Sequence, residues 1–143
     1  MMSAVEVVLQ VFRAVERRDP QLALEVYHPD LEFHWPPPLP YGGSTYGLKA
    51  SLERRPGWAE TWDPLQADAD RQLDPRVVAA SEDEVVVLWR QRGRSVGGQL
   101  LDTPVLGLYQ IRDGKFARAQ MFYFDPVAAA DFLATAKRGP GEA

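Results

Sequence analysis

The sequence predicts one α+β domain with N-terminal helices, a long, curved antiparallel sheet and another helix that closes the chain. Three observations support this: an amphipathic helical pattern at the start, a proline-rich loop after the first strand pattern, and two long apolar runs joined by Asp113-Gly114. A chain of 143 residues can bury a core as a single domain. We expect the domain to span residues 1–136 and residues 137–143 to form a flexible tail.

The N-terminal region reads as two helices followed by a strand. Ser3 and Glu6 fit a capping box, and apolar residues recur behind them at helical spacing. Asp19-Pro20 predicts the N-cap and first turn of a shorter helix, which we expect to end at His28-Pro29. Residues 31–35 then alternate between apolar and polar side chains, as in a half-buried strand.

The middle of the chain is less regular. Residues 36–46 are rich in proline and glycine and predict a stiff loop, and residues 48–55 read as a helix. Trp58 and Trp62 are four residues apart, which places both rings on one side of a further helical turn. Residues 65–73 are weakly patterned, and we expect a strand there because the neighbouring strands need a partner.

The second half of the chain predicts most of the sheet. Residues 76–80 and 84–92 read as strands, and the nearly continuous apolar run in the second predicts a strand covered on both faces. Residues 102–125 predict a long hairpin, because Asp113-Gly114 favours a two-residue turn between its arms. Asp125 is the expected N-cap of the closing helix, since a proline follows it.

Composition excludes several classes of function. The net charge is −4, and the basic residues are spread along the chain, so we expect no nucleic-acid partner. The absence of cysteine excludes disulfides, thiolate catalysis and cysteine-ligated metal sites. No apolar run reaches the ~20 residues that cross a bilayer. We expect a cytoplasmic protein without a signal peptide, membrane contact, metal or other cofactor.

The order of these elements resembles the nuclear transport factor 2-like superfamily, also described as cystatin-like. Within it the chain is most similar to SnoaL-like polyketide cyclases and ketosteroid isomerase-like proteins. The resemblance implies a cone-shaped sheet with a pocket at its open end, where a hydrophobic cyclic molecule binds, and a dimer formed through the sheet. The segments that carry it are Asp19-Pro20, residues 26–30, Tyr46-Gly47, residues 112–115 and Phe124-Asp125.

The resemblance also indicates where the family's catalytic acids would stand. The general-base aspartate of ketosteroid isomerases falls at Trp35, and their second acid falls near Gly107. The arginine–acid pair of limonene-epoxide-hydrolase-like members falls at residues 90–92, which read Arg-Gln-Arg here, and a further acid falls at Phe122. The chain keeps an arginine but has no acid at these positions, which implies either a reassigned chemistry or none.

Four residues are candidates for proton-transfer catalysis. His34 is a natural proton shuttle, although strand alternation places it opposite Trp35 and a surface role is the alternative. Arg90 holds a substrate oxygen if it points inward, or belongs to a solvated stripe if it points outward. Asp102 either accepts from an arginine or serves as a turn residue. Tyr109 either donates to a substrate carbonyl or packs in the core.

We expect an aromatic pocket that binds a hydrophobic small molecule. Gly107 would leave room for a flat ligand, and Tyr41 and Tyr46 could close over the mouth. The candidate ligand-binding residues are Phe33, Trp35, Tyr41, Trp58, Trp62, Val105, Gly107, Phe122 and Phe124.

Two functions remain open at this point. One is a cofactor-free enzyme that isomerises, cyclises or opens an epoxide in a hydrophobic cyclic substrate. The other is a non-catalytic ligand-binding or assembly module, which the apolar residues at the acid positions favour. Leu106 and Leu108 alternate onto the convex face, and we expect a homodimer to form there.

Overall fold

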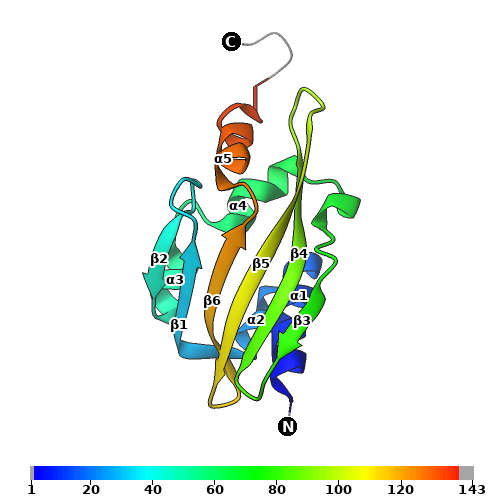
Figure 1. The fold of residues 1–143 in the computed structure, drawn as a ribbon. Coiled ribbons are helices and arrows are strands. Elements are labelled where there is room, and N and C mark those ends of the chain that lie inside the picture. Colours follow the sequence, from blue (N-terminus) through cyan, green and yellow to red (C-terminus); the bar gives the residue numbers. More distant parts are fainter. Residues whose placement is uncertain (1, 139–143) are drawn as a thin grey trace.

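The computed structural model describes residues 2–138, in which a six-stranded sheet and five helices form the predicted α+β architecture (Figure 1). The helices are α1 (Ala4–Arg17), α2 (Pro20–Leu24), α3 (Leu48–Glu53), α4 (Trp58–Trp62) and α5 (Pro126–Thr135). The strands are β1 (Tyr27–Trp35), β2 (Gly43–Tyr46), β3 (Arg76–Ala80), β4 (Glu84–Arg94), β5 (Leu100–Arg112) and β6 (Lys115–Tyr123).

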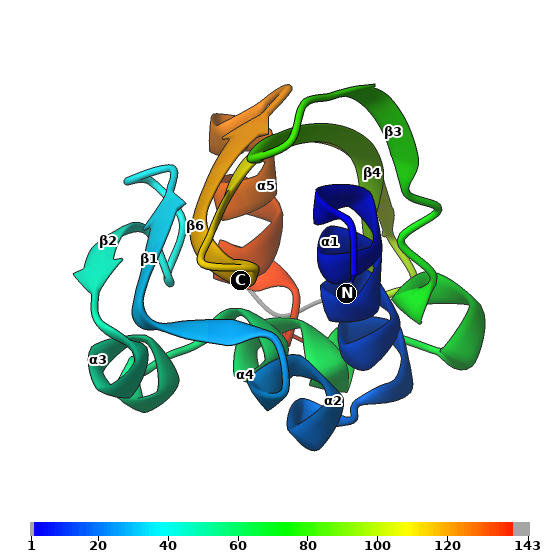
Figure 2. The same cartoon turned by 90° about the horizontal axis from the view of Figure 1, so that it is seen from below.

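The sheet has the strand order β2-β1-β6-β5-β4-β3. Its strands pair antiparallel except β1 and β6, which run parallel, so the sheet is mixed where the sequence predicted an antiparallel one. The predicted turn between β5 and β6 is confirmed, since Asp113 and Gly114 both have positive φ, 55° and 71°. Figure 2 shows the sheet curving around α1, so the helices lie on its concave side.

The two faces of the sheet differ in burial. Along β4, buried residues alternate with half-buried ones, and Val85, Val87, Trp89 and Gln91 face the helices. The prediction that this strand is covered on both faces is wrong, because the helices of the described chain lie on the concave side only. The convex side is therefore an outer face.

Several predicted boundaries shift. Residues 65–73 form no strand but two short 3₁₀ helices, η1 (Asp63–Leu65) and η2 (Asp68–Arg71). The Asp70 carboxylate explains the second, because it accepts from the Ala67 amide at 3.0 Å and from Arg94 Nε at 3.1 Å. The predicted loop after β1 ends in β2, and the second helix ends at Leu24, so that β1 begins earlier than expected.

Helix caps and one aromatic pair fix the ends of the chain. The predicted N-caps at Asp19 and Asp125 are confirmed, since each carboxylate accepts a backbone amide of its own first turn. Phe132 of α5 stacks on Trp62 of α4 with ring centroids 6.1 Å apart, which holds α5 over one end of the sheet.

Most of the predicted tail, residues 137–143, lies outside the described residues. No helix of residues 2–138 is long and apolar enough to cross a membrane.

Candidate functional site

A cavity of about 570 Å³ lies between the concave face, α1 and the α3–α4 segment. This volume is within the range of small-molecule sites. Sheet residues supply an aromatic wall, and helical residues supply the opposite side. The wall residues used below are Tyr27, Phe33, Trp35, Tyr41, Trp89, Tyr109 and Phe116 from β1, the following loop and β4–β6, with Phe12 and Trp58 opposite.

Five of the predicted site residues line this cavity: Phe33, Trp35, Tyr41, Trp58 and Tyr109. The rings pack against one another rather than standing free. Phe33 stacks on Trp35 with centroids 6.2 Å apart, and Trp35 meets Tyr41 edge-to-face at 5.0 Å. The aromatic wall is therefore preorganised by its own contacts.

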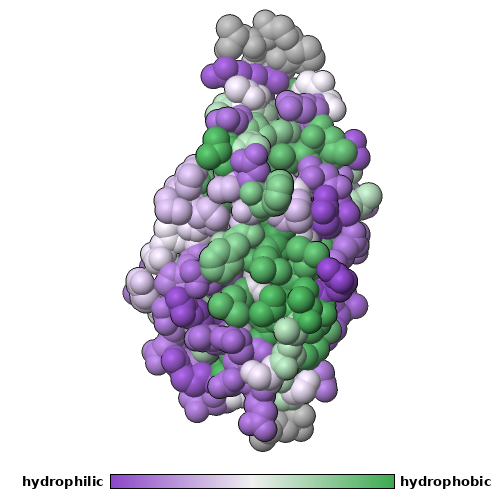
Figure 3. All heavy atoms as spheres, viewed as in Figure 1, coloured by the Kyte–Doolittle hydropathy of each residue, from purple (hydrophilic) through white to green (hydrophobic). Residues whose placement is uncertain are grey.

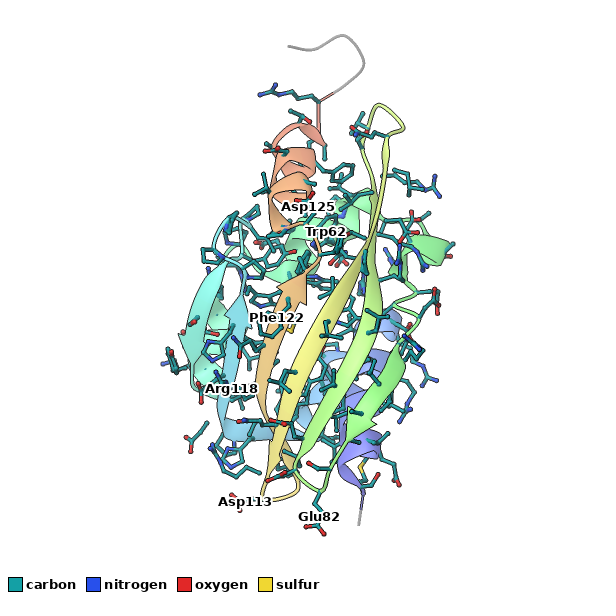
Figure 4. All side chains as sticks on the ribbon, in the orientation of Figure 1. Trp62, Glu82, Asp113, Arg118, Phe122 and Asp125 are labelled. Atoms are coloured by element: carbon teal, nitrogen blue, oxygen red, sulfur yellow. The ribbon has the colours of Figure 1, made fainter. Side chains whose placement is uncertain are left out.

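Other predicted ligand-binding residues lie elsewhere. Trp62 and Val105 are buried in the core, outside the cavity lining. The space expected above Gly107 is filled, because the ring of Tyr109 lies where a Cβ on this glycine would stand. Phe122 and Phe124 are 49% and 81% exposed, and Phe122 lies on the outer face (Figure 4).

A bulge in the β5–β6 hairpin explains the position of Phe122. The pairing register shifts between Gln110 and Ile111, where Phe116 and Ala117 are both buried in consecutive positions. One extra residue in β6 exchanges the two faces of everything that follows it. Beyond the bulge the cavity side of β6 carries residues 119, 121 and 123, and Phe122 points away from it.

A buried chain of hydrogen bonds borders the aromatic wall. The Trp62 indole donates to Tyr41 Oη at 2.9 Å, and Tyr41 Oη lies 2.7 Å from Tyr123 Oη. Tyr123 donates to Gln91 Oε1 at 3.1 Å, so Tyr41 must be the donor to Tyr123. The Trp58 indole also donates to Gln91 Oε1, at 2.6 Å. The network satisfies its own members and joins the loop, α4 and the sheet.

Burial keeps four phenols of this region protonated. It raises the pKa of Tyr27 to about 12 and raises the pKa values of Tyr41, Tyr109 and Tyr123 well above their usual range. For Tyr41, hydrogen bonds from the network partly oppose this effect on the pKa. The cavity therefore offers neutral hydroxyl groups at physiological pH.

Two buried donors on the wall differ from this network. The Trp89 indole N–H has no hydrogen-bond acceptor among residues 2–138, although Trp89 is only 4% exposed. The Trp89 indole lies beside Tyr109, because it lowers the pKa of that phenol against the larger rise caused by burial. The Trp89 N–H does not meet the geometry of a hydrogen bond and keeps its capacity to donate. A phenol hydroxyl that accepts from a neighbour still has its own proton to donate, so Tyr109 also remains a donor.

Charged residues gather at the rim of the cavity, on the α3–α4 side. Arg55 and Glu60 pair loosely at 3.6 Å, and both are more than half exposed. Asp63 forms an ion pair with Arg18 at 2.6 Å, and the Arg18 guanidinium lies over the Trp58 ring at 5.8 Å. No group of three or more His, Asp or Glu side chains in the described chain is arranged to hold a metal ion.

The remaining catalytic candidates lie on the outer face. Arg90 and Asp102 do meet, with Arg90 Nε 2.9 Å from the carboxylate, but strand alternation places them on the side of the sheet opposite Gln91. Arg92 completes this ion-pair cluster at 3.3 Å. His34 contacts Glu32 and a serine of β2 on the same outer side. Of the four candidates, only Tyr109 reaches the cavity.

Sequence reasoning missed Tyr27, Gln91, Trp89 and Asp63. Strand alternation could have identified Gln91 from the sequence, because it is the one polar side chain on the same face as Val85, Val87 and Trp89. Tyr27 was assigned to a helix that in fact ends before it. Asp63 lies in a segment whose path depends on tertiary contacts.

The family model of the SnoaL-like domain matches residues 8–119, which is most of the chain. The chain belongs to the SnoaL-like domain family. Among curated proteins the comparison finds no match to this SnoaL-like chain.

Solved structures share its fold at low sequence identity. TerC, co-crystallised with polyporic acid, superposes with a TM-score of 0.74 at 23% identity, covering 91% of this chain and 97% of TerC. A Xanthomonas campestris protein of unknown function with a cystatin-like fold gives 0.77 at 20% identity, covering 92% and 98%. A candidate SnoaL-like polyketide cyclase from Jannaschia sp. CCS1 gives 0.69 at 19%, covering 93% and 92%. These likenesses establish the nuclear transport factor 2-like fold.

Proposed function

We propose that the cavity binds a small aromatic molecule that carries a carbonyl or similar acceptor oxygen. The observation that supports this most directly is the pair of neighbouring donors, Trp89 N–H and Tyr109 O–H, on an apolar wall. A buried donor without an acceptor is unfavourable, and a ligand oxygen between the two would satisfy both. The co-crystal of TerC with polyporic acid is consistent with an aromatic ligand in this fold.

The charge distribution narrows the class of ligand. The wall around Trp89 and Tyr109 carries no ionisable acid or base other than neutral phenols, so the buried part of the ligand is uncharged. Arg54, Arg55 and Glu60 line the rim, where a polar or charged substituent would remain in contact with water. A flat, uncharged ring system with its polar substituents toward the rim fits both conditions.

Binding is better supported than proton transfer. His34, Arg90 and Asp102 lie across the sheet from the cavity, and the tyrosines on the wall hold their protons. Asp63 and Glu60 are the two carboxylates that line the cavity, and each pairs with an arginine, Arg18 and Arg55. An isomerase or cyclase activity would need one of these two carboxylates as its proton acceptor, and loss of turnover in Asp63→Asn or Glu60→Gln would identify such an enzyme.

A matched pair of probes tests the donor site. 1,4-Naphthoquinone and naphthalene have the same ring skeleton, and only the quinone carries acceptor oxygens; the chain has no cysteine that could add to the quinone. We expect quinone binding, followed by quenching of the fluorescence of the cavity tryptophans Trp35, Trp58 and Trp89, to exceed naphthalene binding. Tyr109→Phe should weaken the quinone about 5-fold, the value of one hydrogen bond, and leave naphthalene unchanged.

The control for this test is Tyr46→Phe, which removes an exposed hydroxyl (66% exposed) outside the cavity lining. It should leave both affinities unchanged. Equal affinity for the two probes, or a quinone affinity that does not depend on Tyr109, would contradict the donor site.

We also propose that two copies of the chain pair through the outer face. Leu88, Leu106 and Phe122 lie side by side across β4, β5 and β6, and Leu106 and Phe122 are 40% and 49% exposed. Figure 3 shows the resulting hydrophobic area in the middle of this face. The row carries no charge, so a second copy can cover it without opposing like charges.

Light scattering measures the mass of the protein in solution and tests whether two copies pair. We expect twice the chain mass of 16.0 kDa for the wild type and the monomer mass for Leu106→Asp. Val127→Asp is the control, because Val127 is an exposed apolar residue (59% exposed) on α5, away from the row. A wild-type mass of one chain at micromolar concentration would refute the homodimer.

A further inference from the structure

A second group of interacting polar side chains lies on the outer face, at the β1–β2 edge of the sheet. Register pairs His34 directly with Ser44, and Glu32 lies two residues before His34 on the same face of β1. His34 Nδ1 is 2.7 Å from Ser44 Oγ, and His34 Nε2 is 3.1 Å from Glu32 Oε1. The three side chains therefore form a serine–histidine–glutamate relay, separated from the cavity by the thickness of the sheet.

The chemistry of the three groups fixes the direction of the relay. A carboxylate can only accept, so the proton shared with Glu32 belongs to His34 Nε2. In the neutral imidazole, Nδ1 then carries a lone pair, which accepts from the Ser44 hydroxyl. A hydroxyl that donates to an imidazole held by a carboxylate is the arrangement that activates serine nucleophiles.

The imidazole is held in place while the hydroxyl stays accessible. The His34 side chain is 14% exposed, and the ring of Tyr46 meets it edge-on at 5.6 Å. Ser44 is exposed on β2, the edge strand of the sheet. In Figure 3 this side of the outer face is hydrophilic, unlike its apolar middle. The base is thus ordered by its neighbours, and an acyl donor can approach the nucleophile from solvent.

We propose that Ser44 is an acyl-accepting nucleophile and that the β1–β2 edge hydrolyses small activated esters. Ser44 Oγ would bond to the acyl carbon while its proton passes to His34 Nδ1, and Glu32 stabilises the imidazolium. The bond from the acyl carbon to the leaving oxygen breaks, and that oxygen takes the proton from His34. Water then repeats the sequence on the acyl-serine, which releases a carboxylic acid and restores the Ser44 hydroxyl.

The test uses p-nitrophenyl acetate with the full chain, reading nitrophenolate release and the mass of the protein. We expect a burst of release together with an acetyl group on the peptide that contains Ser44. Ser44→Ala should abolish the burst, His34→Gln should slow it at least ~100-fold, and Glu32→Gln should slow it less, because Glu32 acts only as a positioning residue. Circular dichroism of each variant checks that it folds.

Two controls match the reacting groups. Ser81→Ala removes an exposed serine whose hydroxyl bonds to Asp83 at 3.1 Å and has no imidazole partner. His28→Gln removes the chain's other histidine, whose ring nitrogens contact the Asp30 amide and the Asp113 carboxylate. Both variants should react as the wild type does. A burst that persists in Ser44→Ala, an acetyl group found only on other residues, or no burst in the wild type would overturn the proposal.

Discussion

The two faces of the sheet are made from the same strands, but they differ in burial and in how their polar side chains are paired. On the inner face, aromatic and polar side chains such as Tyr123 and Gln91 are buried together, and their hydrogen bonds are closed among themselves. On the outer face, apolar Leu106 and Phe122 are half exposed, and the charged groups pair in contact with water. The stability of the inner face therefore depends on packing and on the protonation of its phenols, whereas the outer face should tolerate substitutions with a smaller loss of stability.

The largest expected difference between the faces appears at high pH. Burial raises the folded-state pKa of Tyr27 from an ordinary value of 10.0 to about 12, and it raises the pKa values of Tyr41, Tyr109 and Tyr123 well above the ordinary value. A pKa that is raised in the folded state means stability that is complete below pH 10 and lost as the pH rises above it. We expect the free energy of unfolding to fall by about 1.4 kcal/mol per pH unit for each such phenol.

Urea unfolding at a series of alkaline pH values measures this loss, and tyrosinate absorbance shows when the phenols ionise. Both signals should change together, because the buried phenols ionise mainly on unfolding. Ionisation of these tyrosines in a protein that stays folded would contradict the described burial.

A second comparison removes one large ring from each face. Trp62 is fully buried, stacks on Phe132 and donates to Tyr41, so Trp62→Ala should lower the free energy of unfolding by about 3–5 kcal/mol. Phe122→Ala removes a ring that is already half exposed and should cost about 1 kcal/mol. Chemical denaturation at a protein concentration low enough to keep the chain monomeric gives both values. Similar losses would mean that the outer face is as tightly packed as the core.

A third comparison uses glycine. A Cβ on Gly107 would collide with the Tyr109 ring, so Gly107→Ala should lower the free energy of unfolding by about 1–3 kcal/mol and weaken ligand binding. Gly97 lies in the turn between β4 and β5, where the nearest atom to an added Cβ, Ser95 Oγ, is at 3.8 Å. Gly97→Ala should therefore change stability by less than about 0.5 kcal/mol. Thermal unfolding of the two variants tests the contrast, and equal stability would show that the Tyr109 ring moves aside freely.

The sequence is sufficient for the local elements of this fold. The β5–β6 turn at Asp113-Gly114 and the helix starts at Asp19 and Asp125 follow from one or two residues each, because backbone conformation there depends on the local residue type. The inward direction of Tyr109 also follows, because alternation puts it on one face with Val105 and Gly107 and the family resemblance implies that this face points into the pocket.

The candidate site is less predictable because it depends on register and on distant partners. Without the bulge beside Ile111, Phe122 would share the inner face with Val105, and no local signal in the sequence identifies the extra residue. The direction of Arg90 could not be read from a run of apolar neighbours, although Gln91 beside it marks the buried side. Tertiary contacts determine both the position of the bulge and the face on which Arg90 lies.

The smallest expected effect on stability comes from removing single hydroxyl groups. It distinguishes the hydrogen-bond network of Tyr123 from the donor pair of Trp89 and Tyr109. Tyr123→Phe leaves the Tyr41 hydroxyl without its acceptor and removes one donor from Gln91, so it should lower the free energy of unfolding by about 1–2 kcal/mol. Tyr109→Phe removes a hydroxyl beside the Trp89 indole, whose N–H forms no well-formed hydrogen bond within residues 2–138, and stability should change by less than about 0.5 kcal/mol. Urea denaturation of both variants without ligand makes the comparison. If Tyr109→Phe cost as much as Tyr123→Phe, the protein itself would be using the Tyr109 hydroxyl, and the cavity would lose the donor on which the proposed ligand depends.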